Sequence, residues 1–163
     1  MRITTAITVL LALAAGAARA QAPAGSHASS QPELKWGPAP AVFPAGAQMA
    51  VLQGDPGGAG PFTVRLKLPS GYRIAPHFHP TDENVTVISG IFRVGMGTKF
   101  DEKNMMTLRA GGFVTVPAQG AHFAEAQGPT VVQVHALGPF ALTYVNPAGV
   151  PALHLPQRPF RHD

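Results

Sequence analysis

The chain has 163 residues, 45% of them hydrophobic and only 12% charged, which suits one globular domain with a weakly charged surface. It contains no cysteine, which excludes disulfides, thiolate zinc sites and cysteine nucleophiles. The formal charge is +4, but the basic residues are scattered, so the sequence lacks the basic footprint of a nucleic-acid-binding protein.

Residues 1–20 predict a cleaved signal peptide. Arg2 supplies the positive start, residues 7–15 form an apolar run, and Ala18-Arg19-Ala20 is an A-x-A cleavage signal. The alternative is an uncleaved membrane anchor, but the apolar run is short for a membrane span. We therefore expect export to the periplasm or the medium, with no membrane attachment after cleavage.

The composition of residues 21–47 predicts a flexible leader followed by an N-terminal arm. We expect Trp36 to anchor this arm by packing against the barrel. Between residues 48 and 146, short segments of alternating hydrophobicity are separated by Gly/Pro turns, and residues 62–68 alternate most clearly. No amphipathic helix is evident. About nine to eleven short strands predict an all-β fold, a closed antiparallel barrel or jelly roll. Residues 147–163 hold four prolines and predict an extended tail.

Three potential metal ligands follow one another closely in the sequence. His77 and His79 are separated by one residue, so in an extended strand both imidazoles point the same way. Pro80 and the following polar pair predict a tight corner, after which Glu83 offers a carboxylate. His122 lies just past a second predicted turn and is the best candidate for a fourth ligand.

Together these two stretches resemble the paired motifs of the cupin superfamily. The first motif is matched by Gly71, His77, His79, Glu83 and Gly90, and the second by Gly111, Pro117 and His122. The second motif departs from the family pattern at two positions. Its turn glycine, Gly120, comes one residue late, and Ala126 stands where the family has asparagine.

The resemblance implies a single RmlC-like cupin barrel, also described as a double-stranded β-helix, over residues 48–146. It implies one divalent transition metal, Fe(II), Mn(II), Ni(II) or Zn(II), held by His77, His79, Glu83 and His122, and by analogy a homodimer. The competing interpretation keeps these residues as a hydrogen-bonded polar cluster without a metal. That arrangement would be costly for a buried Glu83 unless its carboxylate were fully hydrogen-bonded.

The function expected from this resemblance is that of an exported metal-dependent oxidoreductase, dioxygenase-like, acting on a small organic molecule. The alternative is a non-catalytic metal-containing module that binds or senses a small ligand. A metal-free cupin of the sugar-nucleotide epimerase kind is a third hypothesis, but the catalytic His and Tyr pattern of those epimerases is not apparent in this sequence. The sequence assigns no catalytic residue beyond the metal ligands.

Strand alternation predicts which residues form the walls of the expected pocket: Val85, Val87, Phe92, Val94, Met96 and Phe113. On the strand 130–137, either Gln133 and His135 face the pocket, or Val132 and Val134 do. The second arrangement is slightly favoured. Tyr72, Arg73 and Tyr144 are potential substrate contacts that are more simply explained as structural residues.

Overall fold

The computed structural model describes residues 28, 30 and 33–149 of the chain. The predicted signal peptide, most of the leader and residues 150–163 of the tail lie outside this part. The predicted domain boundaries at residues 20, 47 and 146 stay predictions. Within the described part, no helix is long and apolar enough to cross a bilayer.

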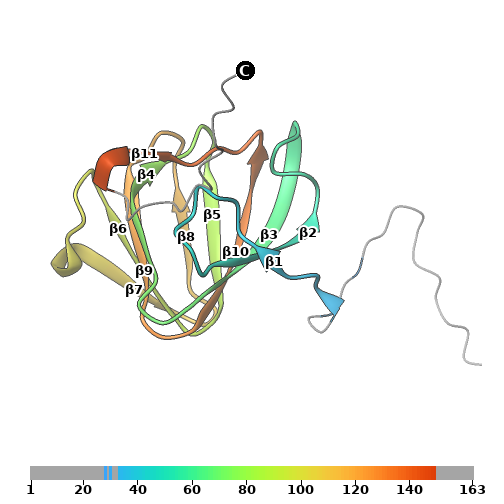
Figure 1. Ribbon diagram of the computed structural model, residues 1–163, viewed down its shortest axis with the longest axis horizontal. Coiled ribbons are helices and arrows are strands. Elements are labelled where there is room, and N and C mark those ends of the chain that lie inside the picture. The colour runs from blue at the N-terminus through green and yellow to red at the C-terminus, as the bar shows by residue number, and fades with distance from the viewer. Residues whose placement is uncertain (1–27, 29, 31–32, 150–163) are drawn as a thin grey trace, which may run out of the picture.

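The described residues form eleven strands in two antiparallel sheets (Figure 1). The six-stranded sheet runs in the order β1 (Gly37–Pro38), β2 (Gln48–Gln53), β3 (Gly60–Leu68), β10 (Thr130–Gly138), β5 (Glu83–Ser89) and β8 (Phe113–Val116). The five-stranded sheet runs in the order β11 (Thr143–Tyr144), β4 (Arg73–Phe78), β9 (His122–Ala126), β6 (Ile91–Met96) and β7 (Met105–Arg109). This arrangement confirms the predicted jelly roll.

Two single-turn 3₁₀ helices lie wholly within the described residues. They are η2 (Glu102–Asn104), which precedes β7, and η3 (Pro147–Gly149), which follows β11. The last strand is short. Only Thr143 and Tyr144 pair with β4, while residues 139–142 form a loop that contacts the candidate site.

The core lies between the two sheets and follows from strand alternation. Phe62, Val64, Leu66 and Leu68 of β3 are each at most 5% exposed, and all point inward. On β10, Val132 and Val134 are buried, which confirms the favoured arrangement of that strand. His135 is exposed instead, and its Nδ1 lies 2.9 Å from Thr63 Oγ1 on the outer face.

The glycines of the matched motifs occupy positions that L-amino acids with side chains adopt rarely. Gly71, Gly90 and Gly111 have φ angles of 72°, 83° and 85°. The late glycine of the second motif has a different explanation. Gln119, in the position where the family has glycine, itself adopts a φ of 62°, and its backbone N–H donates to His79 O at 2.8 Å. The turn is therefore kept although its glycine has moved by one residue.

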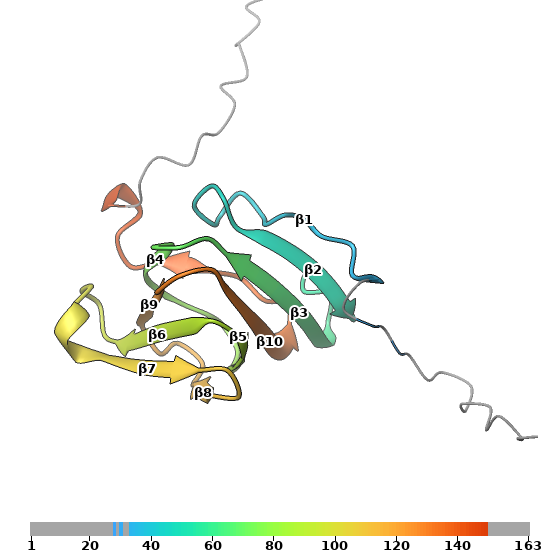
Figure 2. The same ribbon diagram turned by 90° about the horizontal axis from the view of Figure 1, so that it is seen from below.

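The N-terminal arm, residues 39–47, connects β1 to β2. β1 pairs with β2, so both ends of the arm belong to the six-stranded sheet, and the arm lies along the same side of the molecule as β2 (Figure 2). Trp36 precedes β1 and its ring lies 4.0 Å from Lys67 Nζ on β3, a cation–π contact. Trp36 thus anchors the arm against the barrel, as predicted.

Candidate metal centre

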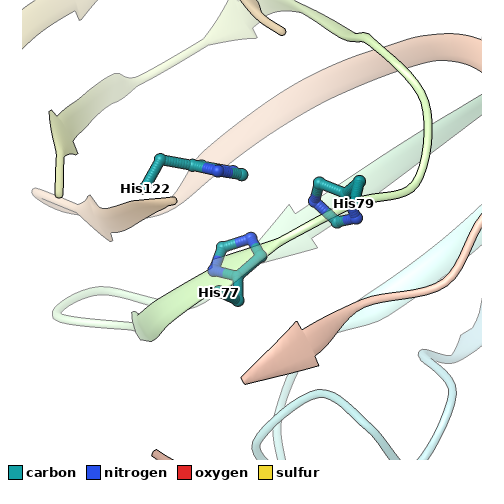
Figure 3. Close-up of side chains that lie close together, drawn as sticks. All are labelled: His77, His79 and His122. Atoms are coloured by element: carbon teal, nitrogen blue, oxygen red, sulfur yellow. The ribbon is translucent and has the colours of Figure 1, made fainter. Parts of the chain in front are cut away.

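The three motif histidines meet between the sheets. His77 lies on β4 and His122 opens β9, and the two residues are direct partners in the β4–β9 ladder. His79 follows the last residue of β4, where the chain turns toward β5. Each histidine is only 3% exposed, and their ligand atoms all lie within 4.8 Å of one another (Figure 3). These three side chains could hold one metal ion.

Backbone carbonyls fix the orientation of each imidazole. Nδ1 of each ring contacts one carbonyl oxygen: His77 to Ala75 at 2.7 Å, His79 to Ala141 at 2.8 Å, and His122 to Gly120 at 3.0 Å. A carbonyl oxygen only accepts, so each Nδ1 must donate a proton. In the neutral ring this leaves the lone pair on Nε2, the atom available to a metal.

Glu83 completes the predicted group of four. It is the first residue of β5 and is 9% exposed. Its Oε2 lies 3.2 Å from His122 Nε2 and 3.8 Å from His79 Nε2. The structure thus brings together all four residues that the sequence singled out, although their role as metal ligands stays a prediction.

One polar atom of this group lacks the hydrogen bond that a metal-free cluster would need. His79 Nε2 is buried without a hydrogen-bond partner among the described residues. The lone pair of His122 Nε2 faces the acceptor oxygen of Glu83, so a positive charge is required between them, either a proton or a metal ion. Three imidazole nitrogens and one carboxylate oxygen are a fitting donor set for a divalent transition metal.

The electrostatics of the site favour the neutral forms of His77 and His79. Burial lowers the pKa of His77 well below its ordinary value of 6.5, and the nearby His122 and His79 lower it further. Burial also lowers the pKa of His79, although the carboxylate of Glu83 opposes this shift. Neutral imidazole is the form that binds a metal, so His77 and His79 do not have to lose a proton first near neutral pH.

The loop after β10 supports His79 in a way that the sequence did not reveal. The ring of Phe140 stacks on that of His79 with centroids 4.2 Å apart and an interplanar angle of 16°. Phe140 is itself held by an edge contact with Phe62 and by a backbone hydrogen bond to Pro56 O. Because Ala141 contributes only its backbone carbonyl, no side-chain motif could have identified its contact with His79.

The four polar residues line a cavity of about 340 Å³ inside the barrel. Of the described residues that line this cavity, only His77, His79, Glu83 and His122 are polar; the others are aliphatic, aromatic or proline. The volume lies at the lower end of the range for small-molecule sites. The cavity therefore offers one coordinating end and an apolar body.

The predicted cavity walls were only partly right. Val85, Phe92 and Val94 line the cavity, and Val87 is buried in the core. Phe113 is 57% exposed and does not line it, because the inward residues of β8 are Val114 and Val116. Met96 is 46% exposed at the end of β6 and also lies outside the cavity wall.

The other polar side chains that the sequence raised as potential contacts have structural partners. Tyr72 and Tyr144 donate their hydroxyls to backbone carbonyls of the arm. Arg73 lies on the outside of the five-stranded sheet, where it and Arg93 form ion pairs with Glu125. Glu125 thus points away from the histidines, as strand parity predicts.

A family model described as "Domain of unknown function (DUF4437)" matches residues 30–138, about two thirds of the chain. The chain belongs to this family. DUF4437 is a cupin-type domain, so the predicted superfamily is confirmed. No curated protein matches the sequence significantly.

Solved structures share the fold of this DUF4437 protein at low sequence identity. The polyketide cyclase RemF from Streptomyces resistomycificus is 16% identical, with a TM-score of 0.60 over 74% of this chain and 86% of its own. A proposed acetylacetone dioxygenase from Methylibium petroleiphilum is 23% identical, with a TM-score of 0.59 over 81% and 89%. An RmlC-like cupin from Shewanella frigidimarina is 16% identical, with a TM-score of 0.53 over 70% and 93%. At these identities the likeness establishes the fold alone.

The lowered pKa values of His77 and His79 predict how the stability of the metal-free protein depends on pH. The unfolded chain takes up protons on these histidines below about pH 6.5, whereas the folded protein resists protonation until lower pH. The free energy of unfolding should therefore fall by about 2–4 kcal/mol between pH 7 and pH 5. Urea unfolding of chelator-treated protein at a series of pH values measures this slope.

The variant His135→Ala, which removes an exposed histidine, is the matched control and should keep the slope of the parent protein. A free energy of unfolding that stayed constant between pH 7 and pH 5 would show that the buried histidines do not resist protonation.

Proposed function

We propose that this protein is an exported, metal-dependent oxidoreductase of the dioxygenase type that acts on a small organic substrate. The observation that carries the proposal is the position of three histidines and one glutamate, all potential metal ligands, on the wall of an otherwise apolar cavity. Residues 1–20 would direct export and then be removed. His77, His79, Glu83 and His122 would hold the metal.

Fe(II), Mn(II) or Ni(II) held by these four residues would supply a Lewis acid able to bind substrate oxygens or O₂. The three backbone carbonyls hold the rings through Nδ1, so the Nε2 atoms would be free to bind the metal. The stacked ring of Phe140 fixes the plane of His79. The apolar walls exclude water and hold the body of the substrate.

Two of the structural neighbours support a substrate with chelating oxygens. One is described as a proposed acetylacetone dioxygenase and another as a polyketide cyclase. Acetylacetone is a β-diketone, whose enolate can occupy two adjacent coordination positions. Enols, diketones and hydroxylated aromatic compounds are therefore the substrates to test first.

The composition of the cavity wall favours a second candidate function, that of a non-catalytic binding or sensing module. Apart from the proposed ligands, none of the described residues lining the cavity is an acid, a base or a nucleophile. A protein that only binds or senses a small ligand through its metal would need only the metal ligands and the apolar wall. Tight ligand binding without conversion would support that alternative.

The ligand assignment predicts the effect of removing one histidine. His77→Ala should lower metal affinity by more than about 100-fold, because loss of a direct ligand costs more than loss of an outer-shell partner. Metal content after dialysis, measured by inductively coupled plasma mass spectrometry, checks this outcome. His135→Ala should keep the metal. If His77→Ala retained metal at full stoichiometry, the assignment would be wrong.

The proposed activity predicts oxygen consumption. Protein loaded separately with Fe(II), Mn(II) and Ni(II) should consume O₂ in the presence of at least one member of a panel of enols, diketones, phenols and flavonoids. An oxygen electrode measures the rate, and His77→Ala treated in the same way is the control for free metal. The absence of turnover with any of these metals, in protein shown to hold one ion per chain, would contradict the oxidoreductase proposal.

A further inference from the structure

The N-terminal arm forms part of the cavity wall. Pro40, Val42 and Phe43 line the cavity beside the residues of the barrel strands. Val42 and Phe43 are partly buried and pack against the core, whereas their neighbour Ala41 is exposed and outside the cavity wall. A segment that precedes the barrel in the sequence therefore helps to determine the space available to a ligand.

Two tyrosines attach this part of the wall to the opposite sheet. Tyr72, next to β4, donates its hydroxyl to Pro44 O at 2.6 Å, and Tyr144 on β11 donates to Val42 O at 2.8 Å. Among the described residues, these are the hydrogen bonds that join residues 40–46 to the chain outside the arm. The two ends of the arm belong to the six-stranded sheet, so the tyrosines make it a bridge between the sheets.

The tyrosines are well suited to this role. Both side chains are largely buried, with Tyr72 7% and Tyr144 9% exposed. Tyr144 also pairs directly with His77, and the two rings lie 6.1 Å apart between centroids. The same residue therefore contacts the arm and a proposed metal ligand, which places the arm's wall next to the coordinating end of the cavity.

We propose that the arm is the specificity-determining wall of this site, with Phe43 setting the size of the ligand and Tyr72 and Tyr144 holding the wall in place. The ligand it admits is a compact molecule with one chelating oxygen pair and an otherwise uncharged, apolar body. This inference rests on the proposed metal site, but it does not require turnover. A charged or multiply hydroxylated body would lose its hydrogen bonds to water and find no partner on these walls.

Ligand binding to Zn(II)-loaded protein tests this inference, since zinc is not redox-active and the ligand is not consumed. Maltol and kojic acid share a hydroxypyranone chelating group, but the ring of maltol carries a methyl group and that of kojic acid a polar hydroxymethyl group. 3-Hydroxyflavone offers similar chelating oxygens on a larger aromatic body. Isothermal titration calorimetry of the three ligands separates the effects of polarity and size.

The parent protein should bind maltol about tenfold or more tightly than kojic acid, because the additional hydroxyl is buried without a partner. Phe43→Ala should raise the affinity for 3-hydroxyflavone relative to maltol by about tenfold or more. The double variant Tyr72→Phe, Tyr144→Phe keeps both rings but frees the arm, so it should shift the size preference in the same direction. Amide hydrogen exchange at residues 41–46 should then also become faster.

Ala41→Ser is the matched control, because this exposed arm residue does not line the cavity; it should leave all three affinities unchanged. Phe43→Leu is a smaller change that keeps the test available if Phe43→Ala does not fold. Metal content is measured for every variant and should equal that of the parent.

Three results would overturn the inference. They are equal affinity for maltol and kojic acid, an unchanged size preference in folded, metal-loaded Phe43 variants, and no binding of any of the three ligands to zinc-loaded protein. None of these depends on oxygen consumption, so failure of the arm's role and failure of the oxidoreductase proposal are distinguishable.

Discussion

The hydrogen bonds between three backbone carbonyls and the Nδ1 atoms of His77, His79 and His122 are the constraint on which the site depends. Each bond fixes a tautomer and a ring orientation, and together they direct three Nε2 lone pairs into one small buried volume. Nitrogen lone pairs and a carboxylate oxygen so close together repel one another unless a proton or a metal ion lies between them. The arrangement is therefore costly in the metal-free protein and favourable when a metal ion is bound.

The barrel explains why such a site can be maintained. Two sheets with inward valine, leucine and phenylalanine side chains bury enough apolar surface to stabilise the fold, so the polar cluster does not have to contribute to stability. His77 and His122 are held as partners across one ladder, while Glu83 comes from the other sheet. The site thus spans the two layers, and the apolar cavity beside it restricts ligands to those with a small apolar body.

Much of this was predictable from the sequence, because strand periodicity is local. Alternation in residues 62–68 identified the inward face of that strand, and the spacing of His77, His79, Glu83 and His122 identified the cluster. For residues 130–137 alternation left two faces open, and the slightly favoured one, with Val132 and Val134 inward, is correct. The errors arose where a residue's environment depends on distant chain segments. Phe113 is apolar but faces outward, because the pairing of β8 with β5 turns Val114 and Val116 inward. The contacts of Ala141 with His79 and of Tyr72 and Tyr144 with the arm carry no local signature, since backbone carbonyls accept the hydrogen bonds.

The central claim is that a metal ion is bound by the Nε2 atoms of the three histidines. Anomalous X-ray scattering from crystals of the metal-loaded protein, collected at the absorption edge of the ion, tests this claim most directly. We predict one strong peak about 2.1 Å from each of the three Nε2 atoms. A peak bonded to Nδ1 atoms, or no peak between the three rings in protein that contains stoichiometric metal, would contradict the account.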